Sequence, residues 1–299
     1  MTGFAGLQAL RGLEQVRSSR VLVLAATTLD IDMLPALYDQ LRAIGKNERL
    51  DVLLFSRGGV VNGARRIALL LREFTQHLGV IVPHYCESSA TLLAMAADEI
   101  IAGDLAIFSP IDPHLHGDAG GDTSSISAQD IRLFGKMCAS WFGADPDAAR
   151  EQALALMCQN IFPPTLAAFY RTTLEMEQIG EELLRRQLPR LDTDARRAIV
   201  RRLMQDYHSH NYALTGQELG GLGLRVERHA QAEALAWDIA RALHTSFGRG
   251  AAESEEDEWD DMLLATRDSL HLRRRRPGGL HGRWRAIKPA AQLEAHPAP

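Results

Sequence analysis

The sequence predicts an α/β protein built on a mainly parallel sheet. Three short apolar runs, residues 20–26, 51–55 and 80–85, have the length and β-branched content of buried strands. Two segments in which apolar residues recur at helical spacing, 31–44 and 60–78, separate these runs. Strands that alternate with helices favour βαβ units, in which right-handed crossovers join parallel strands.

The elements after residue 85 continue this pattern and then become helical. Residues 88–97 are predicted to form a small-residue helix. From about residue 128 to 202 the apolar spacing is helical, with a break at 162–164. The remaining expected elements are two extended segments at 99–102 and 106–108, a capped helical turn at 214–219, a returning strand at 224–226 and a last helix at 230–244. These elements define a predicted domain over residues 1–247.

Residues 248–299 differ in character from the rest of the chain. Residues 251–261 contain seven acidic side chains and no basic one, and residues 273–276 are four consecutive arginines. Segregated charge and terminal prolines favour disorder. We therefore predict a disordered charged tail that is dispensable for the fold.

Composition and charge exclude several classes of protein. The 299 residues are 46% hydrophobic and 24% charged, as in an ordinary globular protein. A formal charge of −5 argues against dedicated nucleic-acid binding. The chain has no apolar run of about 18 residues and no secretory leader, so we expect no transmembrane segment and a cytoplasmic location. Three cysteines without a CxxC motif are expected to be free thiols in a reducing compartment.

Two small-residue turns follow consecutive predicted strands. The first is Ser-Arg-Gly-Gly at residues 56–59, and the second is Glu-Ser-Ser at residues 87–89. Active sites of open α/β sheets form at this edge, where backbone N–H groups can hold an oxyanion and Ser88 would be exposed at a strand-to-helix turn. The alternative is a tight glycine turn and a serine that only caps a helix, since no GxSxG motif is present.

Four motifs occur in the order found in a known family. They are Ser-Arg-Gly-Gly-Val at 56–60, Glu-Ser-Ser-Ala-Thr-Leu-Leu-Ala-Met-Ala-Ala-Asp-Glu-Ile at 87–100, Ser-Pro-Ile-Asp-Pro-His at 109–114 and Ser-His-Asn-Tyr-Ala-Leu-Thr at 209–215. Over roughly residues 7–245 the chain resembles the serine dehydrogenase proteinase family of the Clp peptidase/crotonase superfamily, related to signal peptide peptidase A. The resemblance implies a ClpP/crotonase-like fold of repeated βαβ units with a helical C-terminal half, and serine peptidase chemistry.

The motifs of this family assign roles to individual residues. Ser88 matches the nucleophile, and the amides of Gly59 and Ser89 match the donors of the oxyanion hole. The chain departs from the family at Arg57, which replaces a proline, and at Asn211, which replaces an aspartate. An amide cannot stabilise an imidazolium as a carboxylate does, so the acid of a Ser-His-Asp triad is missing at that position.

Several residues are candidates for the general base. Lys136 is the first, because it is one of only three lysines among 33 basic residues and lies a few dozen residues after Ser88, as in Ser-Lys dyads. It would need a buried site that lowers its pKa. His114 is the rival, since it follows Ile-Asp-Pro near the place of the Clp peptidase histidine. His116 and His210 come next, and the chain could also lack a base altogether.

These observations lead to a serine peptidase-like hydrolase as the expected function. Ser88 would cleave peptide bonds in a peptide or protein substrate, with no organic cofactor and no metal, and we expect a homo-oligomer. A first alternative is an inactive ClpP-fold scaffold or binding protein, favoured by Asn211 and the altered turns. A second alternative, an acyl-CoA enzyme of crotonase type, lacks a catalytic carboxylate pair and gives Ser88 no role.

Overall fold

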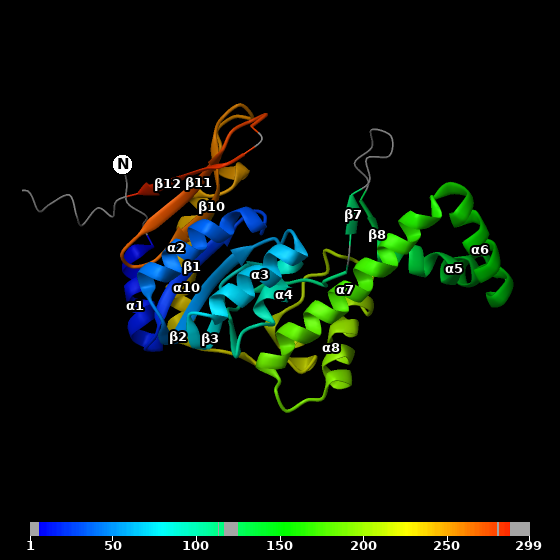
Figure 1. The fold of residues 1–299 in the computed structure, drawn as a ribbon, viewed down its shortest axis with the longest axis horizontal. Coiled ribbons are helices and arrows are strands. Elements are labelled where there is room, and N and C mark those ends of the chain that lie inside the picture. The colour runs from blue at the N-terminus through cyan, green and yellow to red at the C-terminus, as the bar shows by residue number, and fades with distance from the viewer. Residues whose placement is uncertain (1–5, 113, 117–124, 280, 288–299) are drawn as a thin grey trace, which may run out of the picture.

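The computed structural model describes residues 6–112, 114–116, 125–279 and 281–287 (Figure 1). Its centre is a sheet of ten strands in the order β12-β11-β10-β1-β2-β3-β5-β9, with β4 and β6 branching from β2. The strands of the parallel part are β1 (Arg20–Ala26), β2 (Asn47–Ser56), β3 (Thr75–Val82), β4 (Tyr85–Cys86), β5 (Glu99–Ala102), β6 (Ile107–Phe108) and β9 (Val226–Glu227). The parallel βαβ units predicted from the sequence are thus confirmed.

Both faces of the parallel sheet are covered by helices. One face packs against η1 (Ile31–Met33), α2 (Leu34–Ile44), α3 (Val61–Arg72) and α4 (Ser89–Ala94), and the other against α1 (Leu7–Arg17) and α10 (Ala230–Ser246). Strand β1 shows why both faces are apolar, because Leu22 and Leu24 point into the first layer while Val21 and Val23 point into the second. All four side chains are fully buried, as expected for a central parallel strand.

The middle of the chain is helical, as predicted. It contains a short hairpin of β7 (His114–His116) and β8 (Ser125–Ser127), followed by α5 (Ala128–Phe142), α6 (Pro146–Asn160), α7 (Pro163–Gln187), α8 (Thr193–Gln205) and α9 (Gly216–Gly221). The expected break at 162–164 is the start of α7, where proline is favoured because it needs no amide partner. Helices α5 and α6 project from the sheet at one end of α7 (Figure 1). Within the described ranges, no helix combines the length and apolarity needed to cross a membrane.

The prediction of a disordered tail from residue 248 is wrong for residues 259–287. This segment follows η2 (Arg249–Ala251) and forms three antiparallel strands, β10 (Trp259–Ala265), β11 (Leu270–Arg275) and β12 (Arg283–Ile287), of which β10 pairs with β1. The charge blocks do not stay in solvent, because they are complementary: arginines of β11 pair with aspartates of β10, Arg273 with Asp261 and Arg274 with Asp260. This segment therefore extends the sheet beyond β1. Residues 288–299 lie outside the described residues.

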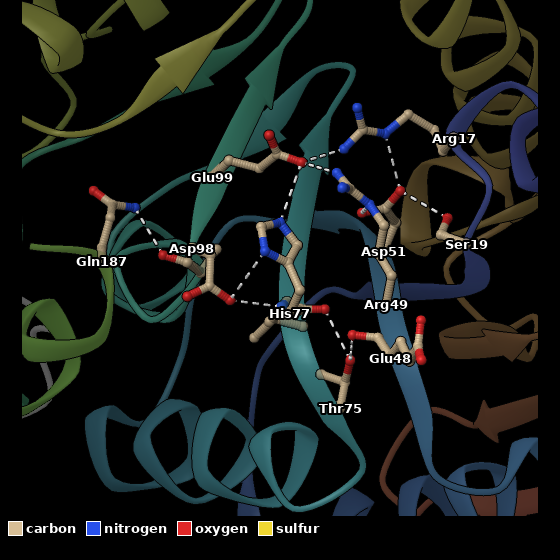
Figure 2. A network of polar contacts seen from close by, with 12 residues as sticks. Arg17, Ser19, Glu48, Arg49, Asp51, Thr75, His77, Asp98, Glu99 and Gln187 are labelled. Carbon is tan, nitrogen blue, oxygen red and sulfur yellow. Dashed lines mark hydrogen bonds and ion pairs between the residues drawn. The ribbon is translucent and has the colours of Figure 1, made fainter.

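A network of ion pairs fastens α1 to the amino-terminal ends of the strands (Figure 2). Arg17 Nε lies 3.0 Å from Oδ2 of Asp51, which is fully buried in β2, and Ser19 Oγ donates to the same oxygen at 2.8 Å. Glu99 of β5 pairs with both Arg17 and Arg49. Burial raises the pKa of Glu99, but hydrogen bonds and ion pairs with these arginines outweigh it, so the pKa is lowered. This network lies at the edge of the sheet opposite to the small-residue turns.

Candidate active site

The two small-residue turns meet at the carboxyl ends of β2 and β4. Ser56, the last residue of β2, pairs in parallel with Cys86 of β4, and the Glu87 amide donates to the Ser56 carbonyl at 3.0 Å. A Cβ atom added to Gly58 would lie 2.7 Å from Cβ of Ser88. Only a glycine permits this approach, so the sequence brings the glycine turn against the serine turn.

Ser88 has a strained backbone conformation. Its φ of 53° and ψ of −123° are disfavoured for a residue with a side chain, and such strain is concentrated at functional sites. The Ser88 amide donates to Ser109 Oγ at 2.6 Å, which helps to hold this conformation. Although Ser88 precedes α4, its side chain makes no capping hydrogen bond. The alternative that Ser88 serves as a helix cap therefore gains no support.

The glycine turn is held by the loop after β1. The Leu29 amide donates to the Gly58 carbonyl at 2.7 Å, and the Val60 amide donates to the Leu29 carbonyl at 2.8 Å. A Cβ on Gly59, whose φ is 144°, would lie 2.4 Å from the Leu29 oxygen, so this position requires glycine. Among the residues that the structure describes, neither the Gly59 amide nor the Ser89 amide donates a hydrogen bond to an acceptor. Two such amides beside Ser88 are able to hold an oxyanion.

A histidine–aspartate pair lies beside the serine turn. His210 is in the loop between α8 and α9, and its Nδ1 lies 2.7 Å from Oδ1 of the buried Asp112. The other carboxylate oxygen, Oδ2, accepts a hydrogen bond from Ser127 Oγ at 3.1 Å. Burial raises the pKa of Glu87, which precedes Ser88, while the charges of Arg57 and His210 lower it less. Asp112 lies three residues after Ser109, whose Oγ accepts from the Ser88 amide, so the pair is close to the serine turn.

The carboxylate of this pair is not at the position that the family motifs indicate. The family's aspartate is matched by Asn211, whose side chain is exposed in the structure. Asp112 belongs instead to the Ser-Pro-Ile-Asp-Pro motif, and the sequence predicts no catalytic role for it. The signal was present, because Asp112 and His210 both belong to motifs of the resemblance.

The structure does not bring Lys136 to Ser88. Lys136 is exposed on α5, where it lines a groove of about 730 Å³ between α5 and α6 together with Arg132 and Arg150. Within the described part of the chain it makes no hydrogen bond or ion pair with Ser88 or its neighbours. His114 and His116 lie in strand β7, for which the structure describes the backbone but not these two side chains.

An aromatic and basic cluster flanks the glycine turn. The Arg57 guanidinium lies 4.0 Å from the centre of the Tyr85 ring and 3.8 Å from the Glu87 carboxylate. Nearby, His84 Nδ1 lies 2.9 Å from His244 Nε2. Burial lowers the pKa of both histidines, and the Arg57 charge lowers both further. This cluster forms a wall beside the site that favours neutral imidazoles.

A cysteine nucleophile and a metal centre both find little support at the site. Complete burial raises the pKa of the Cys86 thiol well above its ordinary value, so this neighbour of Ser88 is a poor nucleophile. Within the described ranges, no group of three or more His, Cys, Asp or Glu side chains is placed to hold a metal ion.

Two curated relatives come from Methanocaldococcus jannaschii: uncharacterized protein MJ0137 is 41% identical over 75 residues, and uncharacterized protein MJ1495 is 26% identical over 236 residues. The first match covers 25% of this chain and 26% of the relative, and the second covers 74% and 70%. The chain thus spans about a quarter of the length of the first relative.

Two solved structures are similar at low identity. A mutant of the 1510-N membrane-bound stomatin-specific protease has a TM-score of 0.42 and 14% identity over 77% of this chain and 86% of that chain. A probable enoyl-CoA hydratase/isomerase from Mycobacterium abscessus has a TM-score of 0.26 and 15% identity over 30% and 44% of the two chains. Scores this low carry no argument about this chain.

The family comparison covers the region of both turns. Residues 5–127 match the family model described as ClpP-like SDH-type serine proteinase. This range contains Ser88, Gly59 and Asp112, whereas His210 lies beyond it. The resemblance to serine dehydrogenase proteinases indicated by the motifs is therefore confirmed over residues 5–127.

Proposed function

We propose that this protein is a serine hydrolase that cleaves peptide bonds with Ser88 as nucleophile. The observation that carries the proposal is the meeting of the strained Ser88 turn with the Gly59 turn, beside the His210–Asp112 pair. The match of residues 5–127 to a serine proteinase family supports a peptidase-like function. The substrate is a peptide or protein.

The proposed reaction is an acyl transfer in two steps. His210 takes the proton of Ser88 Oγ, which forms a bond to the substrate carbonyl carbon while the carbonyl electron pair moves to its oxygen. The amides of Gly59 and Ser89 stabilise this oxyanion. Collapse breaks the C–N bond, and His210 returns the proton to the leaving amine. A water molecule, activated by the same imidazole, then attacks the ester and releases the acid and Ser88.

Asp112 has two roles in this reaction. Its hydrogen bond with Nδ1 of His210 places the ring proton there, so that the lone pair resides on Nε2, where a base must carry it. The carboxylate also stabilises the imidazolium that forms during attack. Because Asp112 is buried and hydrogen-bonded by Ser127, its own orientation is fixed.

His210 is the base that the geometry favours over Lys136. A lysine acts as a base only when desolvation lowers its pKa, and Lys136 is exposed on α5. His210 is anchored by a buried carboxylate next to the serine turn. His114 stays the second imidazole candidate, since its position in the chain is four residues from Ser109–Pro110, the segment that contacts Ser88.

Labelling by a fluorophosphonate probe tests the proposal and separates the candidate bases. The wild-type protein should be labelled, and Ser88→Ala should not. His210→Gln should slow labelling by about 10²-fold or more, the usual contribution of a general base. Asp112→Asn should also slow it, whereas Lys136→Arg should not. Loss of labelling in Lys136→Arg but not in His210→Gln would move the base to the lysine. Absence of labelling in the wild type would favour the inactive scaffold.

A homo-oligomer and a cytoplasmic location are further parts of the proposal. Trp141 and Phe142 at the end of α5, and Phe162 just before α7, are each more than two-thirds exposed, and such apolar surface favours association. Cys86, Cys138 and Cys158 are free thiols, as expected in a reducing compartment. Light scattering after size-exclusion chromatography tests the first part, since a mass near 33.0 kDa would contradict it.

A further inference from the structure

We propose that Arg273, on β11 of the hairpin formed by β10 and β11, is a positioning residue for the oxyanion hole. The inference rests on the proposed function and extends it to a part of the chain outside the family match, which ends at residue 127. In this arrangement, the strands β10 and β11 lock the loop after β1, and that loop holds the turn that contains Gly59.

Arg273 is buried and fully engaged with carboxylates. Only 2% of the residue is exposed, although it lies in a run of four arginines. Its Nε and Nη2 lie 2.9 and 2.8 Å from the two carboxylate oxygens of Asp261, the bidentate geometry of a strong ion pair. Its Nη2 also lies 3.1 Å from Oδ2 of Asp30. The guanidinium therefore links β10 and β11 to the loop after β1.

The loop after β1 is tied to the hairpin at a second point. The Thr27 amide donates to the Asp261 carbonyl at 2.9 Å. At the other end of the loop, Oδ1 of Asp30 accepts a hydrogen bond from the Met33 amide at 3.2 Å, which caps the following helical turn. The Asp30 carboxylate thus accepts from Arg273 at both oxygens, Oδ2 from Nη2 and Oδ1 from Nη1 at 3.4 Å, while Oδ1 also accepts from the helix start. Residues 27–30 are therefore held by the β10–β11 hairpin and by the helical turn that follows.

The same loop holds the oxyanion turn. Leu29, the neighbour of Asp30, exchanges two backbone hydrogen bonds with the turn: it donates to Gly58 and accepts from Val60. The contact is close, because a Cβ on Gly59 would lie 2.5 Å from the Leu29 nitrogen and 2.9 Å from Cγ2 of Thr28. A displacement of Leu29 must therefore move the Gly59 amide.

The consequence of losing Arg273 follows from the sensitivity of oxyanion stabilisation to geometry. Donors act best when they are held at the place where the charge develops. A misplacement of about 1 Å can cost on the order of 10²-fold in rate. The binding of the probe before reaction does not depend on this amide, so the loss should occur in the chemical step.

The experiment compares Arg273→Gln with Arg274→Gln in the full-length chain. Arg274 is the matched control, because it lies on the same strand and pairs with Asp260, while its hydrogen bonds and ion pairs within the described residues do not reach residues 27–30. Two measurements are made. Fluorophosphonate labelling gives the rate at saturating probe and the half-saturating concentration, and hydrogen exchange follows the amides of peptides covering residues 57–60.

We expect Arg273→Gln to lower the saturated labelling rate by about 10- to 100-fold at an unchanged half-saturating concentration. The Val60 amide should also exchange faster. Arg274→Gln should match the wild type in both measurements. Equal labelling rates for the two variants would overturn the proposal, as would a loss confined to the half-saturating concentration.

The two measurements distinguish this inference from the proposed function. If the wild type is not labelled at Ser88, the hydrolase proposal fails, but faster exchange at residues 57–60 in Arg273→Gln still shows that Arg273 orders the turn. Unchanged exchange would refute that ordering. Should Arg273→Gln not fold, Asp30→Asn replaces it, since asparagine can still cap Met33 while its neutral side chain weakens the link to Arg273.

Discussion

Truncation after Gly250 should unfold the protein, because it removes the strands that cover one edge of the sheet. The lost segment contributes four large buried side chains, Met262, Leu263, Leu264 and Leu270, each at most 4% exposed. Burial of such a side chain stabilises a protein by about 1.5–3 kcal/mol, which gives about 6–12 kcal/mol for the four as an upper estimate. Whole domains have stabilities of about 5–15 kcal/mol. The loss is therefore comparable to the entire stability.

The measurement is urea unfolding of the truncated chain followed by circular dichroism, with binding of a hydrophobic dye as a second probe. A chain ending at Ile287 is the control, because it keeps all three strands. We expect the control to unfold cooperatively and the chain ending at Gly250 to bind dye without a cooperative transition. A chain ending at Gly250 that unfolds within about 1 kcal/mol of the control would refute the reasoning from burial.

Three further predictions concern single residues. Ser88→Gly should abolish labelling yet raise the free energy of unfolding by about 1 kcal/mol in urea, since glycine relieves a positive φ; a decrease would contradict the inferred strain. Glu99→Gln should reduce acid sensitivity. The lowered pKa of Glu99 contributes stability that is fully present above the unfolded-state value of about 4.3 and is lost as the pH falls through the folded-state pKa. In urea the variant should therefore be less stable than the wild type at pH 7, and the difference should shrink as the pH falls below about 4.3. Lys136→Arg should leave the melting temperature within about 1 °C of the wild type, because surface substitutions away from special features change little; a large drop would show that the ammonium is structurally engaged.

The parallel half of the fold could be predicted from the sequence because its elements carry local signals. The run at residues 20–26 is apolar at every position after Arg20, and the structure buries it on both faces as β1. The last strands could not be predicted in this way. The arginines at 273–276 look like a solvated charge block, and only the pairing of β10 with β11 shows that Arg273, Arg274 and Arg275 have aspartate partners on β10, 12 or 14 residues away.

The candidate site, like the fold, could be predicted only in part from the sequence. The turns at 56–59 and 87–89 follow predicted strands, so their meeting at one edge of the sheet follows from parallel topology. The contact between His210 and Asp112 joins residues 98 positions apart and depends on how the loop after α8 returns to the sheet. No local pattern encodes that return. For the same reason, the exposure of Lys136 could not be judged before the projection of α5 was known.

The site of covalent modification by a fluorophosphonate tests the central claim most directly. The wild-type protein is incubated with the probe, digested, and the modified peptide is sequenced by mass spectrometry. We expect one adduct per chain, on Ser88, and none after denaturation in urea before the probe is added, because the reactivity depends on the folded turn. An adduct on another residue, or no adduct on a folded chain, would contradict the assignment of Ser88 as the nucleophile.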